Sequence, residues 1–257
     1  MSRVREPLPT HVRDLPALPA SYHETLDAGL RSLDLQLDPV VRAAIDDHVR
    51  LLLAWTSAIN LTAIRDPAAV ATAHVLDSLT ALPLLQALEI DAFLDLGSGG
   101  GYPGLPLAAA LPGVRATLVD ATAKKARFLS VAAEAAGLRE RTSVVTARVE
   151  DLALDPAQRG TWRLVTARAV ASLADLVELA FPLLAARGRL VAWKRGDLSA
   201  ELRAADRAMD ALGGGSHVVH DVAVEGLTEH RLVVATRTGR VPATFPRDPG
   251  VRRRRPW

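Results

Sequence analysis

The chain has no cysteine among its 257 residues. This absence excludes disulfides, thiolate zinc sites, iron–sulfur clusters and any cysteine nucleophile. Long hydrophobic runs are also absent: no uninterrupted apolar stretch approaches the roughly 20 residues that span a bilayer. The first residues, MSRVREPLPTHVRDLP, lack the apolar core of a secretory signal. We therefore expect a cytoplasmic protein that does not enter a membrane.

Lysine is scarce, because only three of the 31 basic residues are lysines, and the formal net charge is only +2. So small an excess is compatible with an anionic partner without requiring one. The clearest basic run is Arg252 to Arg255, and we treat residues 241–257 as a basic tail. A solvated tail and a phosphate-binding tail are both compatible with this run.

The remainder of the chain divides by its periodicity. Residues 1–20 are rich in proline and show little periodicity, which predicts a poorly ordered leader. From residue 21 to about 90, apolar residues recur at spacings of three and four, which predicts a helical N-terminal extension. Asp38 and Pro39 suit the N-cap and the first turn of one of its helices.

Residues 91–240 alternate between predicted strands and helices, which favours an α/β, doubly wound Rossmann-like sheet. The last two strands are separated by a short loop and must therefore be antiparallel, because a parallel crossover needs a dozen residues or more. This is the plan of class I S-adenosylmethionine-dependent methyltransferases. The predicted strands lie near 92–96, 115–119, 142–146, 162–166, 188–193, 217–224 and 229–237, and the helices near 104–111, 123–136, 170–185 and 197–212.

A glycine-rich loop, DLGSGGGYPG at 95–104, follows the first predicted strand. Gly97 and Gly99 allow the backbone to approach a ligand, and Asp120, at the end of the second strand, is placed for ribose hydroxyls. The glycines also satisfy the G-x-G-x-x-G pattern of dinucleotide sites, so the pattern alone leaves a nicotinamide cofactor open. Asp95 favours S-adenosylmethionine, because a carboxylate would repel a pyrophosphate and attract a cationic ammonium and sulfonium.

Two further positions follow the third and fourth strands. Val149 and Glu150 fall where an adenine would lie, the first offering apolar contact and an amide, the second an acceptor for the exocyclic amine. An N-cap cluster is the alternative. Arg168 cannot act as a base at neutral pH, which disfavours an exocyclic amine as methyl acceptor. It can instead bind phosphate or the O6 and N7 edge of guanine, or form a structural ion pair.

The absence of cysteine restricts the methyl acceptor, and the spacing of two histidines argues against a metal site. Methylation of pyrimidine carbon 5 ordinarily needs a cysteine adduct, so the acceptor must be an atom with its own lone pair. His217 and His220 lie an odd number of residues apart on a predicted strand and face opposite sides, so we expect no metal site.

Seven segments together resemble one family, the bacterial 16S (small-subunit) ribosomal RNA guanine-N7 methyltransferases, known as the GidB or RsmG family. The resemblance extends over roughly residues 39–237. It implies methyl transfer from S-adenosylmethionine to a guanine N7, with 16S ribosomal RNA or the small ribosomal subunit as partner. The segments are NLTAIRDP (60–67), HVLDS (74–78), the glycine loop, KKARFL (124–129), ARVED (147–151), TARAVASL (166–173) and WKRG (193–196).

The resemblance also implies contacts to the methyl donor. These are Gly97, Tyr102, Val149, Glu150 and Arg168, although Tyr102 departs from the apolar residue usual at its position. Guanine N7 carries a lone pair and no proton, so the enzyme needs no general base and works by orienting the reactants about 3 Å apart. We expect Arg168→Ala to abolish methyl transfer while leaving the fold intact.

Residues of the extension complete the hypothesis. Asn60, His74, Asp77 and Lys194 are candidates for shaping the guanine pocket or binding adjacent phosphates. His74 and Asp77 are three apart and would share a helix face, where they could equally be core hydrogen-bond partners. We expect a monomer. Two other functions stay open on residues alone: an NAD-dependent oxidoreductase on a similar fold, and a non-catalytic RNA-binding ribosome assembly factor.

Overall fold

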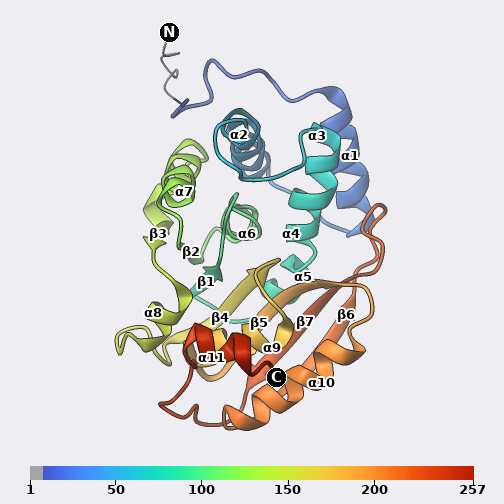
Figure 1. Ribbon diagram of the computed structural model, residues 1–257. Helices are drawn as coiled ribbons and strands as arrows, with labels where there is room; N and C mark the ends of the chain where they lie inside the picture. Colours follow the sequence, from blue (N-terminus) through green and yellow to red (C-terminus); the bar gives the residue numbers. More distant parts are fainter. Residues whose placement is uncertain (1–7) are drawn as a thin grey trace.

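A seven-stranded sheet forms the centre of the computed structural model, which describes residues 8–257 (Figure 1). The strands are β1 (Ala92–Leu96), β2 (Arg115–Asp120), β3 (Thr142–Thr146), β4 (Trp162–Arg168), β5 (Leu184–Arg195), β6 (Gly215–Asp221) and β7 (His230–Arg237). Their order is β3-β2-β1-β4-β5-β7-β6. The first five are parallel, whereas β7 is antiparallel to both β5 and β6. The predicted α/β sheet with an antiparallel end is confirmed.

An apolar core lies on each face of this sheet. Phe93 contributes to one core and Leu94 and Leu96 to the other, as expected for side chains that alternate along a strand. The first core also contains α6 and α7, and the second contains α8, α9 and α10. The bounds are α6 (Gly104–Ala110), α7 (Ala123–Ala135), α8 (Val149–Leu154), α9 (Leu173–Ala180) and α10 (Ser199–Ala211), with a short helix η2 (Arg139–Arg141) before β3.

The helix predicted over 170–185 is shorter than expected. It is α9, which begins at Leu173 and ends at Ala180. Leu184 already pairs with Trp162 as the start of β5, with an irregularity in the register before residue 189. The apolar sequence after residue 180 is therefore buried as sheet and turn and not as helix.

The helical extension packs on the face of the sheet that carries α6 and α7, drawn in blue to cyan in Figure 1. The indole ring of Trp55 and the ring of Phe128, which belongs to α7, have centroids 5.5 Å apart. Asp38 caps the helix that begins at Pro39, as predicted, because the Asp38 carboxylate accepts from the Val40 amide at 2.7 Å. The elements are α1 (Ala20–Ser32), α2 (Pro39–Trp55), α3 (Pro67–Val70), the π-helical η1 (Ala71–Leu76), α4 (Asp77–Leu79) and α5 (Leu82–Gln86).

One run of this extension, Pro67–Gln86, is long and apolar enough by length and composition to cross a membrane. Within the fold, 61% of its apolar window is buried. It packs against α1 and α6 and carries polar residues that interrupt the apolar sequence, His74, Asp77 and Thr80. Burial of this kind is typical of a core helix in a folded domain.

Residues 8–19 differ from the poorly ordered leader that we expected for residues 1–20. They have little regular structure, but the Arg50 guanidinium on α2 donates to the backbone carbonyls of Val12 and Pro16. The Trp55 indole donates to the carbonyl of Pro9 at 2.7 Å. Because these carbonyls are satisfied by α2, the segment is held against the extension. Residues 1–7 lie outside the described part of the chain.

Candidate functional site

The glycine loop after β1 is shaped by left-handed backbone and by contact with α2. Gly97 has φ of +67° and Gly101 has φ of +91°, a region that favours glycine. A Cβ atom on Gly101 would lie 2.7 Å from Nε2 of His48. That nitrogen is hydrogen-bonded to the Gly100 carbonyl at 2.8 Å. The extension therefore supports the loop directly.

Asp95 lies fully buried at the end of β1 beneath this loop. Its Oδ1 accepts from the Thr166 hydroxyl of the neighbouring β4 at 2.8 Å, while Oδ2 is buried without a hydrogen-bond partner among the described residues. Burial raises the pKa of Asp95 to about 6. A half-satisfied carboxylate is costly in a protein interior unless a cationic donor joins it. The observation fits a ligand that carries an ammonium group.

Asp120 joins the glycine loop to the end of β2. Its carboxylate accepts from the Gly99 amide at 3.1 Å and from the Thr122 amide at 2.8 Å. A carboxylate has about four lone-pair sites, so acceptor capacity remains for the hydroxyls of a ribose. The predicted role of Asp120 is compatible with this geometry.

A cavity of about 840 Å³ opens at the carboxyl ends of these strands. Its volume is in the range typical of small-molecule sites. Four predicted residues, Gly97, Asp120, Val149 and Glu150, lie in its wall. The other lining residues are Val119, Ala121, Ala147, Arg148, Val170, Ala171, Asp175, Leu179, Pro249, Arg252, Arg253 and Pro256.

Tyr102 lies outside this lining. Its ring stacks with His74 at a centroid distance of 4.8 Å and lies 4.6 Å from the ring of His48. Burial raises the pKa of Tyr102, and its hydroxyl has no hydrogen-bond partner among residues 8–257. The side chain thus fills the junction between the extension and the glycine loop.

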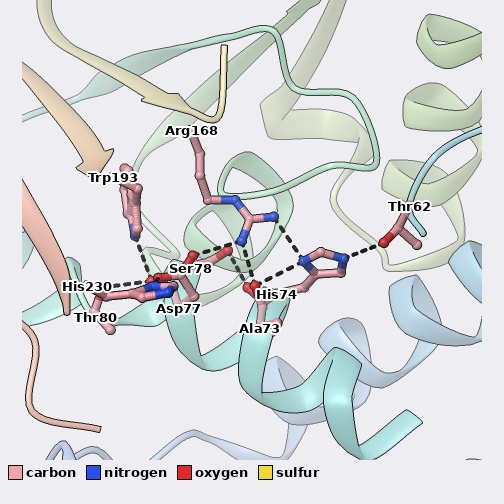
Figure 2. A network of polar contacts seen from close by, with 9 residues as sticks. All are labelled: Thr62, Ala73, His74, Asp77, Ser78, Thr80, Arg168, Trp193 and His230. Carbon is pink, nitrogen blue, oxygen red and sulfur yellow. Dashed lines mark hydrogen bonds and ion pairs between the residues drawn. The ribbon is translucent and has the colours of Figure 1, made fainter. Parts of the chain in front are cut away.

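Arg168, at the end of β4, is the centre of a buried polar network (Figure 2). Its guanidinium donates to Oδ2 of Asp77 at 2.9 Å and to the Ala73 carbonyl at 2.8 Å. The side chain of Arg168 is 14% exposed and that of Asp77 only 5%. Arg168 therefore joins the sheet to the extension, as the structural ion pair that we considered, and it faces His74 as well.

His74 is neutral at pH 7, because burial, followed by the nearby Arg168 charge, lowers its pKa to about 4. The Nδ1 atom lies 3.1 Å from the Arg168 guanidinium, which can only donate, and 3.0 Å from the Ala73 carbonyl, which can only accept, so its role depends on the tautomer. Nε2 lies 2.7 Å from the Thr62 hydroxyl, which can donate or accept. The ring orientation is fixed from both sides.

Asp77 has two further partners, from β5 and β7, as Figure 2 shows. His230 on β7 lies 3.0 Å from Oδ1, and the Trp193 indole on β5 donates to the Asp77 carbonyl at 2.6 Å. Neither was among the predicted site residues. Trp193 lies within the quoted WKRG segment, whereas His230 had no local signal and arrives only through the antiparallel pairing of β5 with β7.

The two remaining candidates lie apart from the network. Lys194 donates to the Ala171 carbonyl at 2.9 Å and pairs with Glu201 at 2.9 Å, so it supports the loop after β4 that lines the cavity. Asn60 is exposed in the loop between α2 and α3. Residues 8–257 contain no group of three side chains that could hold a metal ion.

The arrangement defines a class of protein. A nucleoside-sized cavity beside a buried carboxylate, at the carboxyl ends of a sheet with this strand order, is the class I S-adenosylmethionine-dependent methyltransferase architecture. Two solved structures share the fold. An O-methyltransferase from Bacillus cereus in complex with SAH has a TM-score of 0.56 at 16% identity, covering 84% of this chain and 99% of that one. Cofactor-bound Rv0187 from MTB has a TM-score of 0.58 at 20% identity, covering 83% and 97%.

The family is narrower than the class. This chain belongs to the GidB family, rRNA small subunit methyltransferase G, whose model matches residues 42–231. A ribosomal RNA small subunit methyltransferase G from Dehalococcoides mccartyi (strain CBDB1) is 38% identical over 224 residues, 87% of this chain and 94% of the relative. One from Chloroflexus aggregans is 42% identical over 205 residues, 80% and 85% of the two chains. The resemblance seen in the sequence is confirmed.

Proposed function

We propose that this enzyme transfers a methyl group from S-adenosylmethionine to N7 of a guanine in 16S ribosomal RNA, in the cytoplasm. The cofactor supplies an electrophilic methyl group on its sulfonium. The observation that carries the proposal is Asp95, a fully buried carboxylate with one oxygen left without a partner among residues 8–257. It lies two residues before Gly97, which lines the cavity. A dinucleotide pyrophosphate would add a like charge near this group, whereas an ammonium complements it. Family membership supports the same cofactor and gives no support to an oxidoreductase.

Residues of the cavity wall and of the glycine loop beside it would each bind a different part of the cofactor. Asp120 would hold ribose hydroxyls, and Val149 and Glu150 would contact the adenine. Gly97 and Gly99 keep the loop free of side chains where the cofactor approaches the backbone. Asp95 would hold the amino group, and its Thr166 bond keeps the carboxylate oriented before the cofactor arrives.

The acceptor side is formed where the extension meets the sheet. Arg168 is held by Asp77 and Ala73, and its guanidinium also lies 5.4 Å from the Tyr102 ring centroid. No general base is needed for guanine N7, so these residues act by orientation and by excluding water. We propose that residues 91–240 supply most of the cofactor site and that residues 21–90 help to place the guanine. Arg168, His74 and Asp77 form the boundary between the two.

Methyl transfer to purified small subunits tests the proposal. The chain is incubated with methyl-labelled S-adenosylmethionine and with subunits, or naked 16S RNA, from a strain that lacks this family. Reductive chain cleavage then locates N7-methylguanine. We expect one labelled guanine, and a loss of labelling with Asp95→Asn because the cofactor amino group loses its counter-charge.

Arg163→Ala is the matched control for Arg168→Ala on β4, since the Arg163 side chain is exposed and, within residues 8–257, bonds to the Glu89 carbonyl alone. This variant should label the RNA like the wild type. Label on a protein, on another RNA or at a pyrimidine would overturn the proposed acceptor.

A further inference from the structure

The basic tail, residues 241–257, is docked on the folded domain, although Arg253, Arg254 and Arg255 remain exposed to solvent. Its short helix α11 (Pro249–Arg254) lies close to α8 and α9 (Figure 1, red). Pro249, Arg252, Arg253 and Pro256 contribute to the wall of the cofactor cavity. The tail is therefore part of the site at its adenine end, where Val149 and Glu150 also lie.

A buried carboxylate anchors the tail. Glu178 on α9 is 0% exposed, and Arg247 meets it with a backbone amide at 2.7 Å and a guanidinium nitrogen at 2.6 Å. The Trp257 indole donates to the same carboxylate at 2.7 Å and lies 4.2 Å beneath the Arg247 guanidinium. A charge this deeply buried needs several donors, and the Arg247 amide, the Arg247 guanidinium and the Trp257 indole all belong to the tail. These contacts fix the tail to the folded domain.

The second attachment is at the cavity itself. The Arg252 guanidinium forms an ion pair with Oε1 of Glu150, and the two side chains are 11% and 14% exposed. The Nε of Arg252 is buried and has no acceptor among the described residues. A buried donor left over in a cavity wall is satisfied when a ligand brings an acceptor.

The tail walls the cavity without filling it. With α11 in place the cavity still measures about 840 Å³, which is sufficient for a nucleoside ligand. Arg252 binds Oε1 of Glu150, whereas Nε of Arg148 lies 3.6 Å from Oε2, beyond hydrogen-bond distance. Oε2 can therefore still accept from an exocyclic amine. These features distinguish a wall of the site from a segment that competes with the ligand.

We propose that Arg252 is a positioning residue of the cofactor site, which holds the Glu150 carboxylate toward the adenine amino group and closes the adenine end with α11. The proposal rests on the proposed function, since it assumes S-adenosylmethionine as the ligand. An unrestrained glutamate would lose rotamer freedom on binding, and the ion pair removes that cost beforehand. The same geometry favours adenine over hypoxanthine, whose O6 would meet the carboxylate as a second acceptor.

Calorimetric binding of S-adenosylhomocysteine to the full chain tests the role of Arg252. Arg252→Met keeps the apolar stem and removes the guanidinium, and it should weaken binding about tenfold, as expected for loss of a charge-assisted contact. Arg254→Ala is the control, because Arg254 is exposed on the same helix and lies outside the cavity wall. It should bind like the wild type. Thermal unfolding verifies that each variant is folded.

A double variant separates positioning from general stabilisation. If Arg252 acts through Glu150, then Arg252→Met combined with Glu150→Ala should bind no more weakly than Glu150→Ala alone. Arg252→Met should also reduce the preference for the adenine ligand over its hypoxanthine analogue. Wild-type affinity in Arg252→Met, or additive losses in the double variant, would overturn the inference while leaving the proposed function standing. A wild-type chain that binds no S-adenosylhomocysteine would refute the proposed function itself.

Discussion

Replacing Arg168 with alanine should destabilise the whole fold, contrary to the expectation from sequence that the fold would stay intact. The Arg168 guanidinium is the charged partner of Asp77, and both side chains are less than a third exposed, at 14% and 5%. Removing one member of a buried pair leaves an uncompensated charge and costs about 3–5 kcal/mol. Asp77 would keep its contact to His230, so we expect the lower end, about 3 kcal/mol.

The measurement is unfolding by urea and by heat, followed by circular dichroism. A loss of about 3 kcal/mol corresponds to a decrease in Tm of roughly 6–12 °C for a chain of this size. Arg163→Ala, on the same strand but exposed, should change stability by less than about 0.5 kcal/mol. Arg168→Ala combined with Asp77→Ala should be less destabilised than the sum of the single variants, because the second change removes the stranded charge. Strict additivity, or an Arg168→Ala variant as stable as the wild type, would refute the reasoning.

Two further predictions concern pH. Because burial raises the pKa of Asp95 to about 6, and the ionised form binds an ammonium, affinity for S-adenosylhomocysteine should rise by up to about tenfold per unit as pH increases toward 6 and then level off. Calorimetry from pH 5 to 8 measures this dependence of affinity on pH. The same dependence in the Asp95→Asn variant would contradict the prediction. Burial lowers the pKa of His48 to about 4, so between pH 6.5 and 4 the unfolded chain binds more protons and the free energy of unfolding falls as pH falls, by up to about 1.4 kcal/mol per unit. His48→Gln should show a shallower dependence in urea titrations, and an unchanged slope would disprove the assignment.

Local patterns in the sequence were enough to predict the strands that form the site. The bounds of β1 and β3 match those expected, because each is a short run of strand-forming residues between turn residues, buried in β1 and partly exposed at the sheet edge in β3. The glycine loop and Asp120 lie at the ends of β1 and β2, where parallel strands of an open sheet bring their ligands together.

The features that sequence reasoning missed depend on contacts between distant segments. His230 reaches Asp77 across 153 positions of sequence, and Arg252 reaches Glu150 across 102. His230 has no spacing or motif that marks it, and the basic run that contains Arg252 does not indicate Glu150 as its partner, since both pairings depend on how β7 and α11 pack. The same holds for residues 8–19, whose prolines suggest disorder although Arg50 and Trp55 supply the bonds that hold them.

Deletion of the gene for this chain, in the organism that encodes it, tests the central claim most directly. Small-subunit RNA from the deleted strain is probed for N7-methylguanine by reductive chain cleavage, with a plasmid copy of the gene as the control. The account predicts that one cleavage site disappears on deletion and returns with the wild-type gene but not with the Asp95→Asn gene. Persistence of the modified guanine in the deleted strain would contradict it.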